Sequence, residues 1–313
     1  MTIVRILLAM ALLVASGCTR TRTSVAVDAA LLTQVPRDSV AVGAMRIKAM
    51  RNTPAWKRLL ENKAVNERLD EIAKETTFDA RKDLWELLWS TDGKDGLVYA
   101  RGEFAPMGLE PKSERKGVTR TSYKGQMMIG DENGAVWFIN SSTAVAGRTE
   151  KLRAMIDSRD TRKVGPGESL QAKIESIPPS AHMWLAADAA FLPKAPADGK
   201  ADGPFANIAQ NLPMLLRAVQ GLTGHVNLAD GVNMEFAATC NDEKGAKLVH
   251  DSLRGVLGIA RIALPSKEKQ ALLPLLDAMQ VEQQKTSTLL KANLTVGQIE
   301  KLQEMVGGGS GTR

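Results

Sequence analysis

The stretch "QVPRDSVAVGAMRI", from Gln34 to Ile47, places a proline-containing turn before a run of small and branched apolar residues. A short apolar run that follows a turn signal is typical of a buried β-strand. The stretch "SIPPSAHMWLAAD", from Ser176 to Asp188, repeats this arrangement in the second half of the chain. The recurrence of one strand signal in both halves indicates that the fold is built from a unit that occurs twice.

Two further landmarks recur in the same order in both halves. The first is an Asp-Gly pair before a strand, and the second is a closing amphipathic helix. They are "KDGLVYARGEF" (94–104) with "ADGVNMEFAAT" (229–239), and "TEKLRAMI" (149–156) with "IEKLQEMV" (299–306). The sequence therefore predicts an α+β fold of two similar repeats, residues 29–163 and 170–306, each an antiparallel sheet packed with helices.

Local signals within the first repeat predict several helices. Thr53 before Pro54 predicts a helix start, because the hydroxyl can cap the helix and proline lacks only an N–H that the first turn does not use. The stretch from Ala80 to Trp89 predicts another helix, in which Trp85 and Trp89 lie one turn apart. Tryptophans at this spacing are more typical of a core than of a ligand platform.

The second repeat contains a clear alternating strand. Val232, Met234 and Phe236 point to one face, while Asn233 and Glu235 point to the other. This pattern predicts a half-buried antiparallel strand with one face in the core and one face toward water or a partner.

Capping residues mark the helices that follow this strand. Asp242 predicts the start of a long amphipathic helix, and Ser266 predicts the start of the next. Thr295 and Gln298 form a capping box that opens the last helix.

Three segments have the composition of connections. The stretch "KVGPGES" (Lys163 to Ser169) predicts a linker between the repeats, and "APADGKADGP" (Ala195 to Pro204) predicts a surface loop. Residues 307–313, "GGGSGTR", predict a disordered tail.

The amino-terminal residues 1–17 have the pattern of a secretory signal peptide. Ile6 to Val14 is continuously apolar and follows Arg5. A run of this length is typical of a signal-peptide core and is shorter than the ~20 residues that span a bilayer. A buried core helix is the alternative, but the polar, basic stretch after Cys18 has no helical periodicity.

The sequence "LLVASGC" (Leu12 to Cys18) resembles the lipobox of bacterial lipoproteins, in which small residues precede a cysteine. The resemblance implies that a diacylglycerol is attached to the Cys18 thiol and that a peptidase cuts just before this residue. Residues 18–28 would then form a lipid-anchored tether. Ala15 departs from the family, which more often has leucine there. Because Ala15-Ser16-Gly17 also suits an ordinary signal peptidase, plain secretion is the alternative.

Other features of the tether bear on localisation. In the lipoprotein family, a non-acidic residue after the cysteine, here Thr19, often accompanies sorting to the outer membrane. We therefore expect an exported protein anchored to a bacterial membrane, on the periplasmic side of the outer membrane.

The body of the chain also resembles a known group. The succession of "FDARKDLWELL" (Phe78 to Leu88) and "GLVYARGEF" is similar to that in uncharacterised, duplicated bacterial secreted proteins. This resemblance supports the fold prediction and implies no activity.

Composition narrows the classes of function. The 313 residues carry a formal net charge of +6, but only 4% are aromatic, so stacking platforms for bases are scarce and we expect no nucleic-acid partner. The chain has two cysteines. If Cys18 is acylated, Cys240 has no intrachain disulfide partner; if it is not, a Cys18–Cys240 disulfide is the alternative.

The sequence contains no recognisable catalytic motif. His182, His225 and His250 are far apart and lack ligand spacing, so we expect each to be a satisfied surface or boundary residue. We name no catalytic residue, no metal site and no cofactor. The hypothesis is a cell-envelope lipoprotein that binds or scaffolds without catalysis, held to the membrane by acyl chains on Cys18, with an unknown envelope protein or ligand as partner. The alternatives are an exported hydrolase with a dispersed site and a carrier of small apolar ligands between two sheets.

Overall fold

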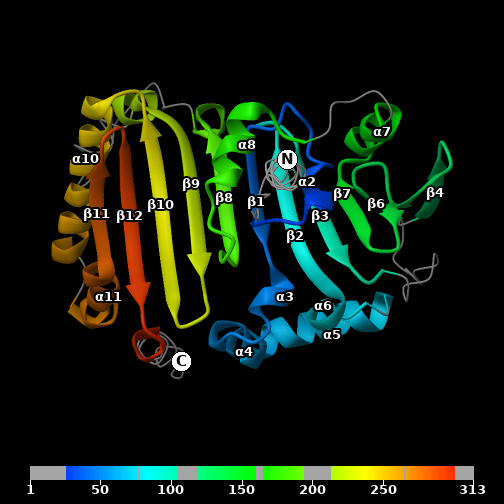
Figure 1. Ribbon diagram of the computed structural model, residues 1–313. Helices are drawn as coiled ribbons and strands as arrows, with labels where there is room; N and C mark the ends of the chain where they lie inside the picture. The colour runs from blue at the N-terminus through cyan, green and yellow to red at the C-terminus, as the bar shows by residue number, and fades with distance from the viewer. Residues whose placement is uncertain are drawn as a thin grey trace, which may run out of the picture.

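The computed structural model describes residues 26–76, 78–104, 119–159, 165–193, 213–263 and 266–299. Its strands form one antiparallel sheet of twelve strands, in the order β11-β12-β10-β9-β8-β1-β2-β3-β7-β6-β5-β4 (Figure 1). The α+β class and the antiparallel pairing are therefore confirmed.

Helices lie between some of the strands along the chain, and other strands follow one another directly. The strands are β1 (Ala41–Met45), β2 (Leu84–Thr91), β3 (Gly96–Gly102), β4 (Thr119–Tyr123), β5 (Gln126–Gly130), β6 (Ala135–Asn140), β7 (Thr143–Gly147), β8 (Met183–Asp188), β9 (Val219–Asn227), β10 (Val232–Cys240), β11 (Met279–Gln284) and β12 (Ser287–Leu294). The helices are α2 (Ala29–Leu32), α3 (Ile47–Met50), α4 (Pro54–Glu61), α5 (Lys63–Thr76), α6 (Ala80–Asp83), α7 (Thr149–Asp157), α8 (Glu168–Glu175), η2 (Ala189–Phe191), α10 (Glu243–Ala263) and α11 (Ser266–Ala278).

The two halves of the chain share a single sheet, which corrects the expectation that each half has its own. Strands β1 and β8 pair in the middle, with Gly43 opposite Leu185. Residues 41–44 of β1 are all buried. Pairing β1 with β8 supplies hydrogen-bond partners for a strand edge that each half would otherwise expose.

One face of the sheet carries the largest hydrophobic cluster. Val42, Leu88, Tyr99, Val145 and Trp184 point to this face, as their positions in the strand register require. They pack against buried side chains of α2, α7 and α8: Leu31, Leu32, Leu152, Met155, Ile156, Leu170 and Ile174. We call this face the core face.

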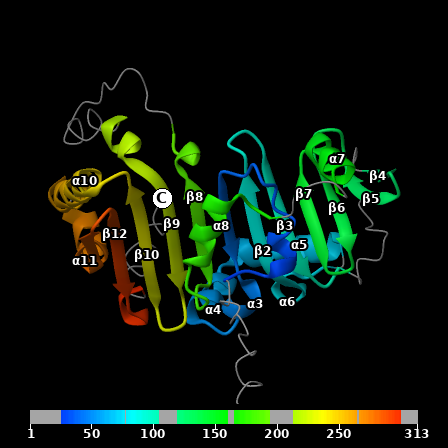
Figure 2. The same ribbon diagram turned by 45° about the horizontal axis from the view of Figure 1, so that its top comes forward.

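Other helices cover parts of the opposite face. Ile47 and Met50 of α3 and Trp56 of α4 pack against the sheet at one end of the strands. Ala246 and Val249 of α10 pack on the β9 and β10 side. Figures 1 and 2 show α4, α5 and α6 crossing one end of the strands, with α10 and α11 beside β11 and β12. The central part of this face lies between these two groups of helices, and we call it the open face.

The predicted helix over Ala80–Trp89 is wrong beyond its first turn. Helix α6 ends at Asp83, and Leu84–Thr91 is strand β2, which pairs with β1 and β3. The segment "LWELLW" is apolar at almost every position, so its periodicity does not separate a buried strand from a helix. Pairing on both edges, which depends on distant segments, decides for the strand.

The predicted helix starts are confirmed. The Thr53 hydroxyl accepts a hydrogen bond from the Trp56 N–H at 3.2 Å, and α4 begins at Pro54. Asp242 accepts from the Gly245 N–H at 2.7 Å at the start of α10. Helix α11 begins at Ser266.

The capping box before the last helix is confirmed as well. The Thr295 N–H donates to the Gln298 side chain at 2.9 Å, and the Gln298 N–H donates to the Thr295 hydroxyl at 3.3 Å. Most of the closing helix predicted over 299–306 lies outside the described residues, as do the loop Ala195–Pro204 and the tail 307–313.

Residues 26–28, which were predicted to lie in the tether, belong to the folded body. Ala26 is fully buried, and its carbonyl accepts a 2.7 Å hydrogen bond from the Trp184 indole N–H. Asp28 caps α2 by accepting from the Ala30 N–H. The chain therefore enters the core face immediately after the segment predicted to carry the lipid.

Replacing Trp184 with phenylalanine is expected to weaken the attachment of residues 26–28 to the core face. The variant leaves the buried Ala26 carbonyl without its donor, which costs about 1–3 kcal/mol of unfolding free energy. We expect faster amide hydrogen exchange over residues 26–35 than over β9 and β10. Trp56→Phe, in the hydrophobic cluster under α3 and α4 on the opposite face, serves as the control. Equal exchange over residues 26–35 in the two variants would show that the indole does not hold the segment.

Candidate functional site

A row of facing residues crosses the middle of the open face. The register places one residue from each of six neighbouring strands in this row: Val98, Trp89, Gly43, Leu185, Gly224 and Phe236. Residues directly opposite one another on paired strands point to the same face, so their side chains lie side by side. The row joins the first half of the chain to the second.

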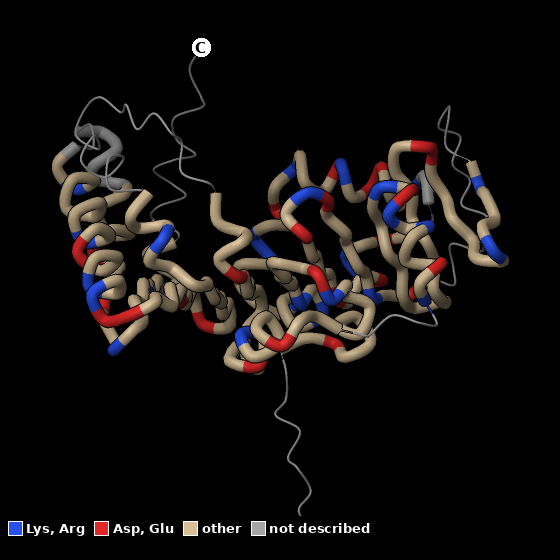
Figure 3. The backbone as a smooth tube through the Cα atoms, turned by 90° about the horizontal axis from the view of Figure 1, so that it is seen from above, with Lys and Arg blue, Asp and Glu red and all other residues tan. Residues whose placement is uncertain are grey.

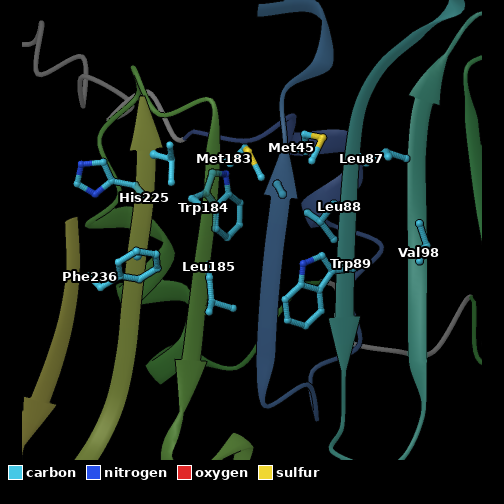
Figure 4. Close-up of a pocket in the computed structure, with 13 residues that line it drawn as sticks. Met45, Leu87, Leu88, Trp89, Val98, Met183, Trp184, Leu185, His225 and Phe236 are labelled. Carbon is cyan, nitrogen blue, oxygen red and sulfur yellow. The ribbon is translucent and has the colours of Figure 1, made fainter. Parts of the chain in front are cut away.

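A second apolar row runs beside the first, and the two enclose a groove. It contains Leu87, Met45, Met183 and Val226 from β2, β1, β8 and β9. The groove has a volume of about 500 Å³, and its lining contains no aspartate, glutamate, lysine or arginine. Burial lowers the pKa of His225, the one ionisable residue in the lining, which favours the neutral imidazole. Figure 4 shows the Trp89 and Phe236 rings on either side of Leu185.

Two glycines let the aromatic rings lie against the floor of the groove. A Cβ atom at Gly43 would lie 2.4 Å from the Trp89 indole nitrogen, and one at Gly224 would lie 2.3 Å from a Phe236 ring carbon. Real Cβ atoms do not approach other atoms so closely, so only glycine permits these ring positions. The low floor therefore depends on two residues without side chains.

The groove exposes large apolar side chains to solvent. Val98 is 45% exposed, Phe236 40% and Phe191, which follows β8, 37%. The Phe191 ring lies 6.2 Å from the Trp89 ring, centroid to centroid, and extends the aromatic surface. Contiguous apolar patches of this kind are typical of sites that bind a ligand or a partner.

A second apolar pocket continues from the groove on the far side of Phe236. It has a volume of about 390 Å³ and is lined by Leu222, Val249, Leu253 and Leu290, among others. Phe236 lines both spaces. The Phe236 ring therefore lies between the groove and this second pocket, which helix α10 lines.

Charged residues lie elsewhere on the body. Figure 3 shows lysine and arginine mixed with aspartate and glutamate over both halves of the described chain. The groove therefore offers apolar contact rather than charge.

A cluster of ionisable groups sits on the core face, behind the groove. Burial raises the pKa of Glu86 to about 7, while the hydrogen bond from the Asp28 N–H, 3.2 Å long, opposes the rise. Asp28 pairs with Arg101 at 3.0 Å, and Arg101 also donates to the Ser142 and Thr143 hydroxyls. This cluster joins Asp28, at the start of α2, to β2 and β3. It therefore holds the first described residues of the chain against the sheet.

The histidines have protein partners or lie within the sheet. His182, just before β8, accepts the Leu228 N–H at 3.1 Å, and burial lowers its pKa. Burial also lowers the pKa of His225 on β9, while nearby Glu235 opposes the shift. His250 on α10 lies 2.9 Å from Asp251. The three imidazoles lie on separate elements and do not form a common site.

The two cysteines are the remaining candidates from the sequence. Cys240 is buried with its Sγ 3.8 Å from the Ala238 carbonyl, and burial raises its pKa, as expected for an inert thiol. Cys18 lies outside the described residues. Within the described ranges, no group of three or more His, Cys, Asp or Glu residues is placed to hold a metal ion.

The sequence analysis did not identify the groove. It assigned Trp89 to a helix, whereas the structure places this residue on β2 in the groove floor. It correctly placed Val232, Met234 and Phe236 on one face, but Phe236 is partly exposed rather than buried in a core. One sequence signal was available: Gly43 and Gly224 lie inside strands, where glycine often marks a close approach.

The class defined by these features is an α+β protein with one long antiparallel sheet and helices on both faces. No family model and no curated protein matches the sequence. Among solved structures, the chain is similar to crystal form III of TP0453, with a TM-score of 0.51 at 10% identity over 88% of this chain and 97% of that chain. Crystal form I of TP0453 matches with a TM-score of 0.45 at 11% identity, over 90% and 97%. At these identities the likeness is one of fold.

Across the described part of the chain, no helix is both long enough and apolar enough to cross a bilayer.

Proposed function

We propose that this protein is an exported lipoprotein, anchored through acyl chains on Cys18, whose body binds an apolar partner without catalysis. The observation that carries the binding role is the uncharged groove on the open face. The lipobox-like sequence before Cys18 carries the anchoring role. The site of action is the periplasmic face of a bacterial outer membrane.

The length of the tether supports a body held close to the membrane. Seven residues, Thr19 to Val25, separate Cys18 from the buried Ala26. Fully extended, they span at most about 25 Å. Two or three acyl chains on one cysteine bind a bilayer almost irreversibly, because each buried CH₂ contributes about 0.8 kcal/mol. The groove would therefore stay near the lipid surface.

Replacing Cys18 with alanine tests the anchor. We expect the wild-type protein in the membrane fraction of lysed cells and Cys18→Ala in the soluble fraction, because the variant has no thiol to acylate. Cys240→Ala, which removes the other cysteine, is the control and should stay with the membranes. If Cys18→Ala partitions like the wild type, the anchor is not at Cys18.

We also propose that the body is an internal duplication, and the strand order supports this. Outward from the centre, the first half runs β1-β2-β3-β7-β6 and the second runs β8-β9-β10-β12-β11. In each half the last two strands form a hairpin whose second strand pairs with the third strand from the centre. The recurring sequence landmarks fall on equivalent strands: β1 with β8, and β3 with β10. An inserted β4–β5 hairpin and the pair α10–α11 distinguish the halves.

A carrier of small apolar ligands is the second candidate, and the groove lining favours it. The sequence analysis placed such a ligand between two sheets. Because the halves share one sheet, the position for a ligand is now the open face, where Met45, Met183 and Leu185 line the groove. Methionine side chains suit such a role because they adapt to irregular ligand shapes.

A further inference from the structure

We propose that the groove binds the hydrocarbon chain of a single-chain fatty acid, laid across the strands from Trp89 to Phe236. The inference rests on the proposed binding role of the body. It goes further by choosing one class of occupant, and three properties of the groove support the choice.

The first property is that the backbone of the floor is already hydrogen-bonded. Strands β2, β1, β8 and β9 each pair with a neighbour on both edges. Their N–H and C=O groups therefore have partners within the sheet. An extended peptide in the groove would find no backbone partners, and each unpaired polar group would weaken binding. A hydrocarbon chain has no polar groups along its length and incurs no such cost.

The second property is size. From β2 to β10 the row makes four interstrand steps of about 4.8 Å, a length of about 19 Å. The extended hydrocarbon chain of a long-chain fatty acid has a similar length, so one such chain can lie across the strands from Trp89 to Phe236.

The third property is that Ala26, where the described chain begins, lies on the other side of the sheet. The Ala26 carbonyl is held by the indole of Trp184, which points to the core face. The neighbouring Leu185 points to the open face and lines the groove. Ala26 and the groove therefore lie on opposite faces of the sheet, and the occupant we propose is a free ligand rather than the acyl chains on Cys18.

The shape of the lining suits a flexible apolar chain. The Trp89 and Phe236 rings offer broad surfaces at the two ends, and Met45 and Met183 line the neighbouring row. Val98 closes the β3 end of the row and is half exposed. The carboxylate of the ligand would remain in water at the open mouth, since the lining offers it no cation.

Tryptophan quenching by a brominated fatty acid tests the proposal. The probe is stearic acid brominated at mid-chain, with unbrominated stearic acid as the blank, added to Cys18→Ala protein purified without detergent. Bromine quenches an indole only at close contact, so we expect quenching that saturates. Trp89→Phe should remove most of it. Trp137→Phe should retain it, because Trp137 is 1% exposed on the core face.

Two matched variants test the position of the ligand. Val98→Asp places a charge in the groove and should weaken binding about ten-fold or more, since the carboxylate would lie against the chain. Leu59→Asp makes the same kind of change on α4, outside the groove. Val98 and Leu59 are each 45% exposed, so neither variant should unfold the protein. We expect Leu59→Asp to bind like the parent protein.

Several results would overturn the inference. They are no saturable quenching, equal quenching in Trp89→Phe and the parent, or equal weakening by Val98→Asp and Leu59→Asp. Quenching by brominated phosphatidylcholine vesicles but not by the free acid would replace the fatty acid with a membrane surface. Photo-crosslinking in cells from position 98 separates this outcome from failure of the proposed function. A captured protein partner without fatty-acid binding would leave the binding role intact and reject the ligand, whereas the absence of both would reject both.

Discussion

Replacing Glu86 with glutamine is expected to raise the free energy of unfolding at pH 8 by about 3 kcal/mol and to change it little at pH 4. Glu86 lies on the core face beside Asp28, and burial raises its pKa from 4.5 to about 7. The folded protein therefore holds a proton on this carboxyl that the unfolded chain releases at lower pH. Glutamine keeps an oxygen to accept the Asp28 N–H and carries no charge to desolvate.

The sign of the pH dependence follows from the raised pKa. Below pH 4.5 the carboxyl is protonated in both states, and its favourable contribution to stability is fully present. As the pH rises from 4.5 to 7, the unfolded state gains by ionising while the folded state does not, so the contribution is lost. Above pH 7 the folded protein holds a charge that is buried beside Asp28.

Denaturant titrations at pH 4, 6 and 8 check this prediction. The difference between Glu86→Gln and the wild type should grow across the series. Glu168→Gln is the control, because that side chain is 94% exposed, and its effect should stay within about 0.5 kcal/mol at each pH. A constant difference across the series would mean that Glu86 ionises normally in the folded protein.

Replacing Gly43 with valine is expected to lower the free energy of unfolding by about 2–3 kcal/mol and to displace the Trp89 indole. The position lies at the centre of the sheet, opposite Leu185 on one side and Trp89 on the other. An added Cβ would lie 2.4, 2.7 and 2.9 Å from three atoms of the rigid indole. The backbone at Gly43 cannot move without breaking strand pairing. The Trp89 indole must therefore move away from Gly43 and into the space of the groove.

Thermal unfolding and tryptophan fluorescence measure the two effects of Gly43→Val. Gly96→Val is the matched control: this glycine lies on β3, where a Cβ has only an ordinary contact, 3.9 Å from the Ser90 carbonyl oxygen. The control should keep the wild-type stability and emission spectrum, and it should bind the brominated fatty acid normally. If the two variants unfold alike, the close approach of Trp89 to Gly43 does not exist in solution.

Local signals were enough to predict many of the elements. The Thr53-Pro54 start, the Asp242 cap and the Thr295–Gln298 box each depend on neighbouring residues, and all are confirmed. The strand from Val232 was equally clear, because alternation along one strand is also local. Strands β9 and β11 were not predicted, since β9 is interrupted by two glycines and β11 carries mostly polar residues.

The groove and the buried carboxyl depend on contacts that no local pattern encodes. Trp89 and Phe236 come from β2 and β10, which lie on either side of the β1–β8 pair. The pKa of Glu86 is raised because the side chain is buried on the core face, where the distant Asp28 packs beside it. In both cases the residues are far apart in the sequence, and no periodic pattern predicts that they lie close together.

The amino-acid sequence alone determined the α+β class, the capped helix starts and the recurrence of the same signals in both halves. These properties follow from steric preferences and from hydrogen bonds between near neighbours. Tertiary structure decided that the halves share one sheet, that "LWELLW" is a strand and that an apolar groove crosses the middle. The strand at "LWELLW" depends on pairing β2 with β1 and β3. The shared sheet and the groove depend on pairing β1 with β8, because that contact satisfies two strand edges and brings apolar side chains from distant segments onto one open face.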